Sequence, residues 1–282
     1  MDDTGQTAYL TIRHALLLCF LVIGIQLVLD MLFGSAIEGF APDARAIAIF
    51  LVSLVSLNAV LYLASRKDGR LVSRLDFRQV KSLRLSLLLP IAVVAAGCAV
   101  VNGIFDKLLS DNIASVAQMN REMSAQMGDN LLIIFVFAVL INPIFEESFF
   151  RGFLVVGLAR NYGRWNAMIM VAALFGAIHV NPTQIVSAFA FGLFLNWLML
   201  STAKLYYTII AHSLYNASAL LQGSFLADPL VSPKLQLFRL GKTGIDVIDC
   251  FGIVALFLGL IWCIVIVQKG NKARGLGASK PR

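Results

Sequence analysis

The chain has 282 residues, of which 59% are hydrophobic and 14% charged, and its mean hydropathy is +0.82. A soluble domain has about 25% charged residues, so this composition excludes a water-soluble globule. Lys and Arg outnumber Asp and Glu by 23 to 16, but they lie between and after apolar runs, where they orient a membrane protein. We therefore expect an integral membrane protein in contact with lipid, and no nucleic-acid partner.

Apolar runs long enough to cross a membrane recur along the whole chain. A helix needs roughly 20 apolar residues to span a hydrocarbon core about 30 Å thick. We expect eight such helices, over residues 14–34, 44–65, 84–105, 131–159, 165–180, 184–201, 205–222 and 248–268. Pro143, within the long fourth run, should kink or break its helix. No internal repeat or linker is visible, which predicts an all-α polytopic membrane protein with a single domain over residues 1–282.

The charges of the loops predict the orientation of these helices. Residues 66–84 hold seven basic side chains against two acidic ones, and residues 269–282 hold five basic side chains and no acidic one. Cytoplasmic loops are enriched in Lys and Arg, so both segments and both termini should be cytoplasmic. The more acidic segment 106–129 should lie outside. For a bacterial protein, which the compact chain suggests, the membrane would be the inner one.

The outer loop contains a pattern typical of an amphipathic helix. Its apolar residues recur at spacings of three and four, at Ile113, Val116, Met119, Met123 and Met127. Such a helix can lie in the membrane interface. A plain interfacial connector is the simpler interpretation, and a substrate gate is the alternative.

Ionisable residues inside a spanning helix cost several kcal/mol each and usually mark function. The fourth run contains Glu146, Glu147 and Arg151. On a helix Glu147 and Arg151 face one another four residues apart, in the favourable order of acid before base. Glu146 is rotated by about 100° from Glu147 and cannot share that partner equally well. We therefore expect Glu146 to be available as a general base.

Two of the three histidines also lie in apolar runs. His179 ends the fifth run one turn after Phe175, and His212 lies in the seventh run one turn before Asn216. His14, at the start of the first run, is interpreted as an interfacial residue. A single histidine in a membrane helix is often only an interhelical hydrogen-bonding residue. Two acids, an arginine, two histidines and an amide on three helices are together the groups that hydrolysis by an activated water requires.

In order and spacing these residues resemble the signature of the CPBP intramembrane proteases. This family, also called ABI, includes the type II CAAX prenyl endopeptidases and bacteriocin-processing or immunity proteins. The matching blocks are Glu146-Glu147-x-x-x-Arg151, Phe175-x-x-x-His179 and His212-x-x-x-Asn216. The segment Phe189-Ala190-Phe191-Gly192 also resembles the family's block between the two histidines, whereas Asn196 stands where many members have a glycine and adds a polar group near the site.

The resemblance covers roughly residues 130–222, and it implies a catalytic core in helices four to seven. Residues 1–129 would be the variable N-terminal spans with the outer loop, and residues 223–282 the last loop, the last span and a basic tail. The family implies that Glu146 activates the attacking water and that His179 holds or polarises it. His212 and Asn216 would stabilise the oxyanion, while Glu147 with Arg151 would support the helix.

The resemblance leaves open whether a metal takes part. Glu146, His179 and His212 could furnish three zinc ligands with water as the fourth, or the same groups could act without metal. The expected enzyme is thus an intramembrane endopeptidase, metallo- or glutamate-dependent, that cleaves a membrane-embedded or lipidated peptide. The alternatives are a proton-coupled transporter and a catalytically silent immunity or scaffold protein.

Overall fold

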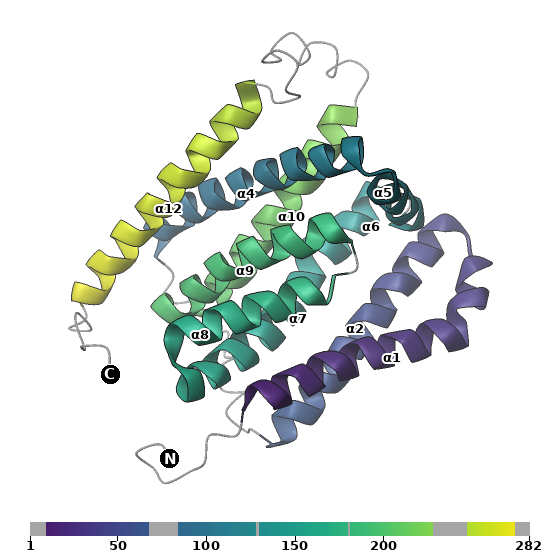
Figure 1. Ribbon diagram of the computed structural model, residues 1–282, viewed down its shortest axis with the longest axis horizontal. Helices are drawn as coiled ribbons and strands as arrows, with labels where there is room; N and C mark the ends of the chain where they lie inside the picture. Colours follow the sequence, from purple (N-terminus) through teal and green to yellow (C-terminus); the bar gives the residue numbers. More distant parts are fainter. Residues whose placement is uncertain (1–9, 68–83, 128–129, 180, 228–246, 274–282) are drawn as a thin grey trace. The chain divides into compact units, whose positions relative to one another are not determined.

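The computed structural model describes residues 10–67, 84–127, 130–179, 181–227 and 247–273 (Figure 1). These ranges are almost entirely helical and contain no strand, so the expected all-α fold is confirmed. In chain order the elements are α1 (Ile12–Glu38), α2 (Pro42–Lys67), α4 (Leu85–Asn112), α5 (Ala114–Met127), α6 (Leu131–Ile134), η2 (Phe135–Ile141), α7 (Asn142–Glu147), η3 (Ser148–Val155), α8 (Val156–Ala177), α9 (Pro182–Thr202), α10 (Leu205–Ala227) and α12 (Val247–Ala273).

The predicted membrane spans all fall on helices. Within the described ranges, six helical stretches are long and apolar enough to cross a membrane. One of them, Leu131–Ala177, contains the fourth predicted span and residues 165–177 of the fifth. α10, which covers the span predicted at 205–222, is not among the six. The segments that carry most of the orientation argument, 68–83 and 274–282, lie outside the described residues, and the orientation stays a prediction.

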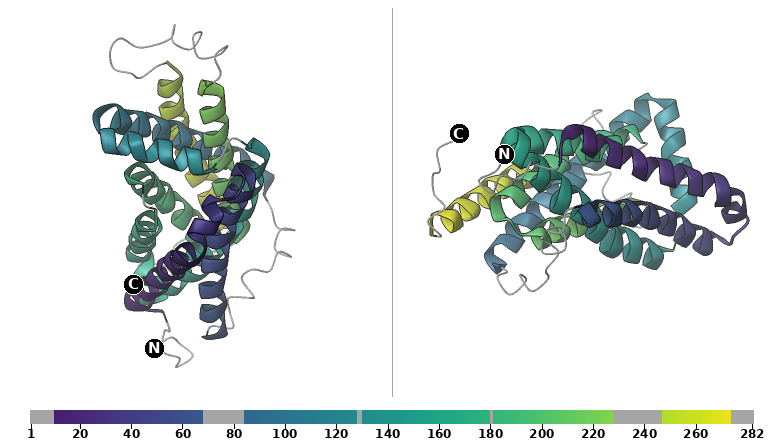
Figure 2. Two further views of the ribbon diagram at one scale, coloured as in Figure 1. Left: turned by 90° about the vertical axis from the view of Figure 1, so that its right-hand side faces the viewer. Right: turned by 90° about the horizontal axis from the view of Figure 1, so that it is seen from below.

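The chain folds as two compact units. Unit 1 comprises Met1–Arg78 and Leu109–Ile209, and unit 2 comprises Gln79–Leu108 and Ile210–Arg282. In unit 1, α1 and α2 pack against each other, as both views in Figure 2 show, and Gln26 of α1 donates a hydrogen bond to Ser53 of α2 at 3.1 Å. α8 packs along α9 in the same unit. In unit 2, α4 and α12 approach closely at Gly97, where an added Cβ would lie 2.8 Å from Leu256.

The core of unit 1 is built around the helical segment η3. All eight residues of Ser148–Val155 are buried, and their aromatic and aliphatic side chains cluster with buried residues of α1, α2, α8 and α9. A helix that is buried on every side has no face for water or lipid. Any ionisable group on it must therefore find its partners inside the protein.

Pro143 was expected to kink or break the long helix, and it does not end it. The seven residues before α7 form the π-helical segment η2, and the backbone N–H of Asn142 donates to the carbonyl of Phe137, five residues earlier. This wider register accommodates a residue that has no N–H of its own. A second π-helical segment, η3, follows directly. Such segments are rare and often lie at functional sites, and here they flank the turn that carries both glutamates.

The fourth and fifth predicted spans are separated at Gly163. Its φ of 76° and ψ of 168° fall inside a run that is otherwise helical, in a region of backbone space essentially restricted to glycine. The chain therefore turns between the two spans at one residue. After α8, the side chain of Asn181 caps α9 by accepting from the backbone N–H of Thr183 at 2.9 Å, and Pro182 occupies a favourable first position.

The expected amphipathic helix is α5, in unit 1. Val116 is buried, and Asn120 and Met123 both contact the side chain of Asn181 at the start of α9. This helix is therefore held against the connection between α8 and α9, which also carries His179. Its predicted position in the membrane interface stays a prediction.

Candidate active site

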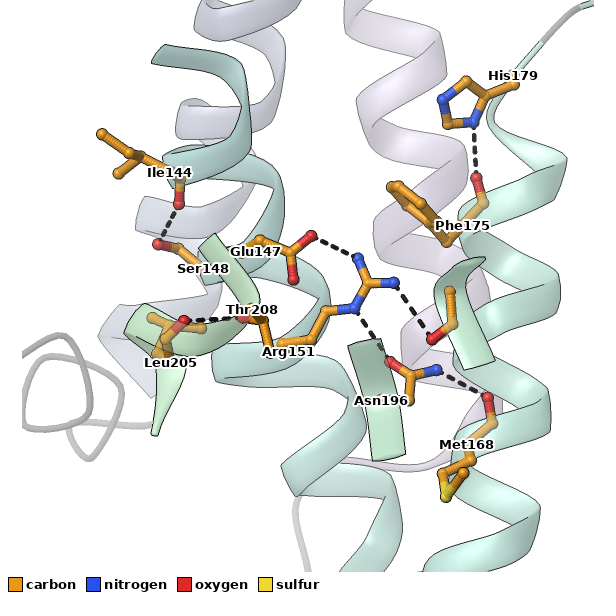
Figure 3. A network of polar contacts seen from close by, with 11 residues as sticks. Ile144, Glu147, Ser148, Arg151, Met168, Phe175, His179, Asn196, Leu205 and Thr208 are labelled. Atoms are coloured by element: carbon orange, nitrogen blue, oxygen red, sulfur yellow. Dashed lines mark hydrogen bonds and ion pairs between the residues drawn. The ribbon is translucent and has the colours of Figure 1, made fainter. Parts of the chain in front are cut away.

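The centre of the candidate site is a buried ion pair. Arg151 of η3 donates from Nη1 to Oε1 of Glu147 at 2.8 Å, and both side chains are completely buried (Figure 3). The pair spans one helical turn, as the spacing of four residues predicts. The two opposite charges compensate each other in a region where an isolated charge would be very costly.

Two further groups, both on α9, accept hydrogen bonds from Arg151. Its Nε donates to Oδ1 of Asn196 at 3.1 Å, and its Nη2 donates to the backbone carbonyl of Gly192 at 3.5 Å. Asn196, itself fully buried, donates in turn from Nδ2 to the carbonyl of Met168 on α8 at 2.8 Å. The polar network of Figure 3 therefore joins the helix of the glutamates to both α8 and α9.

An aromatic ring covers the guanidinium from α8. The Cζ atom of Arg151 lies 4.3 Å from the centre of the Phe175 ring, and the ring of Phe150 contacts Phe175 edge-to-face at 5.0 Å. Such a cation–π contact is strengthened where water is excluded. At Gly192 an added Cβ would lie 3.3 Å from both Arg151 Nη2 and Phe175 Cδ1. The glycine therefore leaves room for the guanidinium beside the ring.

His179 lies two residues after Ala177, the last residue of α8. Its Nδ1 lies 2.8 Å from the backbone carbonyl of Phe175, and its ring meets the Phe175 ring edge-to-face at 5.2 Å. A carbonyl oxygen only accepts hydrogen bonds, so Nδ1 must carry the proton. In the neutral imidazole Nε2 then keeps its lone pair. Figure 3 shows that the second ring nitrogen points away from the Phe175 carbonyl.

Glu146 occupies the next position on α7, beside the buried pair. It is partly exposed, in contrast to fully buried Glu147, as expected for a neighbour rotated by about 100° on a helix. Its charge also acts on Arg151. The two adjacent glutamates therefore differ in burial, because Glu147 is enclosed with the arginine and Glu146 is partly exposed.

The structure brings together only part of the predicted set. Glu146, Glu147, Arg151 and His179 belong to unit 1, whereas His212 and Asn216 lie one turn apart on α10 in unit 2. Among the described residues no three His, Cys, Asp or Glu side chains form a group that could hold a metal ion. The three suggested zinc ligands are not all within one unit.

Sequence reasoning flagged Asn196 only as a departure from the family pattern and did not predict its bond to Arg151. The available signal was an amide in an apolar run, which must find a hydrogen-bond partner when buried. The part of Phe175 as the ring beneath the guanidinium was also missed, because residues 24 apart on different helices have no spacing rule that pairs them.

The paired glutamates, the buried arginine and the histidine one turn after Phe175 are thus set in apolar helices. Residues 128–218 match the family model for type II CAAX prenyl endopeptidase Rce1-like proteins. The expected resemblance to the CAAX proteases is confirmed over this segment, about a third of the chain. A search of curated proteins found no match, and neither did a search of solved structures. All four residues expected to react, Glu146, His179, His212 and Asn216, lie within the matched segment.

Proposed function

We propose that this protein is an intramembrane endopeptidase that hydrolyses a peptide bond with water activated by Glu146. The observation that carries the proposal is the Rce1-like match over residues 128–218, which contains every side chain the reaction needs. Glu146 lies in a helical stretch apolar enough to cross a membrane, and His179 follows the end of that stretch by two residues. The substrate would therefore arrive through the lipid, as a membrane-associated or lipidated peptide.

Glu146 would act as the general base. Its carboxylate takes a proton from water while the oxygen adds to the carbonyl carbon of the scissile bond. The same proton then passes to the departing amide nitrogen as the C–N bond breaks, which gives a new carboxylate and a new amine. The Glu147–Arg151 ion pair supports this role, because it fixes the helix turn that carries Glu146.

His179 would orient the attacking water. Because its Nδ1 donates to the Phe175 carbonyl, the lone pair on Nε2 can accept a hydrogen bond from water. A histidine held through its other nitrogen in this way cannot rotate freely. The contact between the two rings restrains it further.

His212 and Asn216 would stabilise the tetrahedral oxyanion. Both can donate a hydrogen bond from a side chain, and at a spacing of four residues on α10 they share one face of the helix. Donors that are already in position when negative charge develops are the largest single contribution in many hydrolases. We expect removal of either donor to lower kcat by roughly 10²- to 10³-fold.

Zinc remains an alternative for water activation. Glu146, His179 and His212 are residue types that zinc accepts as ligands, and the metal would supply a Lewis acid and a more acidic water. The mechanism proposed above assigns proton transfer to Glu146 and needs no metal. Treating the purified protein with a chelator and adding zinc back tests the alternative, since a metal-independent protease keeps its activity.

The deciding experiment measures cleavage of membrane-associated and prenylated peptides by the purified protein in lipid. Wild type is compared with Glu146→Gln and His179→Ala, and with the matched controls Glu122→Gln and His14→Ala. Glu122 is an exposed acid on α5, and His14 is an exposed histidine on α1. We expect the first two variants to lose cleavage and the controls to keep it. No cleavage by wild type over a broad panel, or full activity in Glu146→Gln, would refute the proposal.

A further inference from the structure

Asn196 of α9 forms hydrogen bonds with both Arg151 and a backbone carbonyl of α8. Its Oδ1 accepts from Arg151 Nε at 3.1 Å, and its Nδ2 donates to the carbonyl of Met168 at 2.8 Å. The guanidinium can only donate and the carbonyl can only accept, so the orientation of the amide is fixed by its two partners. Asn196 is completely buried, and neither bond can be replaced by bulk water.

Only a side chain with a donor and an acceptor on one short stem serves both partners. An aspartate carboxylate would accept from Arg151 but could not donate to Met168, and it would add a second negative charge beside Glu147. Leucine has nearly the same shape and offers neither group. At a fully buried position each unmade bond leaves an unsatisfied polar group. The chemistry of the position therefore favours asparagine over both near-isosteres.

The two helices tied by this amide carry the two groups proposed to handle water. Glu146 lies on α7 directly before Glu147, the ion-pair partner of Arg151. His179 lies two residues after α8, the helix that supplies Met168 and Phe175. We propose that Asn196 is a positioning residue that sets the separation between Glu146 and His179 by holding Arg151 against α8.

This inference rests on the proposed function and goes beyond it in naming a residue outside the matching motif blocks. Asn196 would touch neither substrate nor water and would act only through Arg151 and Met168. Its loss should therefore change the rate of the chemical step and leave substrate binding almost unchanged. A misplacement of about 1 Å between reacting groups can cost on the order of 10²-fold in rate.

The kinetic test compares Asn196→Leu and Asn196→Asp with wild type. For Asn196→Leu we expect kcat to fall roughly 10- to 100-fold with KM nearly unchanged. A protonated aspartic acid regains both a donor and an acceptor, so the kcat of Asn196→Asp relative to wild type should rise as the pH is lowered. The same ratio should stay flat for Asn196→Leu, because leucine adds no ionisable group.

The matched control is Met199→Ala, a cavity in the core of unit 1 on the same helix. It should lower thermal stability and leave kcat almost unchanged. Wild-type kcat in Asn196→Leu, or an equal loss of kcat in Met199→Ala, would overturn the positioning role.

A distance measurement decides the inference even if the wild type cleaves no peptide and the proposed function fails. Spin labels at exposed Ile144 on α7 and exposed Ala177 on α8, in a variant whose native cysteines are replaced, report the separation of the two helices. We expect Asn196→Leu to shift or broaden the distance distribution and Met199→Ala to leave it unchanged. An unchanged distribution in Asn196→Leu contradicts the proposal.

Discussion

At the scale of single residues, the candidate site depends on one arginine whose three guanidinium nitrogens each donate a hydrogen bond. Arg151 contacts a carboxylate on its own helix, an amide and a carbonyl on α9, and an aromatic ring on α8. A buried charge is tolerated only where it is paired and hydrogen-bonded. The arginine and its partners therefore depend on one another, and removing one of them leaves the others with unsatisfied polar groups.

A double-mutant cycle tests this dependence. We expect Arg151→Met and Glu147→Gln each to lower the free energy of unfolding by about 3–5 kcal/mol, because each removes one partner of a completely buried pair. The double variant should lose clearly less than the sum of the two. Unfolding in mild detergent measures all four proteins, and strictly additive losses would show that the two side chains do not act as a pair.

Some of the contacts at the candidate site could be predicted from the sequence, and others could not. The Glu147–Arg151 pair was predictable, because a spacing of four within one helix is a local rule. The bonds of Asn196 were not, because its partners lie on other helices and are brought close by packing. The bond of His179 is local, to the carbonyl four residues earlier, but the sequence does not show which ring nitrogen makes it. The Asn196–Arg151 bond joins residues 45 positions apart.

At the scale of helices, spans were predictable from the length of apolar runs, and internal irregularities were not. A proline without an N–H can end a helix or shift its hydrogen-bonding register, and the sequence around Pro143 allows both. The register shift occurs here, within a helix whose following segment is entirely buried. The break at Gly163 fell within the predicted connection at 160–164, but the single residue that makes it was not identified.

Gly163 provides a test at this scale. Gly163→Ala should lower the free energy of unfolding by about 1–3 kcal/mol, because alanine is strained at its φ of 76° and ψ of 168°. The control is Gly24→Ala in α1, where an added Cβ meets nothing within 4 Å and where alanine favours the helix. Thermal unfolding compares the two, and a Gly163→Ala protein as stable as Gly24→Ala would contradict the assigned backbone conformation.

At the scale of the whole molecule, the exposed surface of several helices is apolar, as lipid requires. Only three of the 27 residues of α1 are buried, so most of its apolar side chains face outward. In such a setting water is scarce at the site, and each electrostatic contact there is stronger than in solution. Composition alone made this property predictable, because a chain with 14% charged residues cannot cover itself with polar groups.

A charge on the lipid-facing surface should impair insertion. Leu27, near the middle of α1, is 62% exposed, and Leu27→Arg should cost about 2.5–3.5 kcal/mol of insertion free energy. Gln118→Arg, on the exposed polar side of α5, is the control and should insert normally. The fraction of each protein that stays in the membrane after an alkaline wash measures the difference, and equal fractions would contradict the assignment of α1 as a spanning helix.

The central claim is that water activated by Glu146 cleaves a peptide bond inside the membrane. Its most direct test is cleavage in water enriched in oxygen-18, followed by mass spectrometry of the products. The account predicts one heavy oxygen in the new carboxyl group of the N-terminal product, with no product at all from Glu146→Gln. Product formation without the heavy oxygen, or labelled product from Glu146→Gln at the wild-type rate, would contradict it.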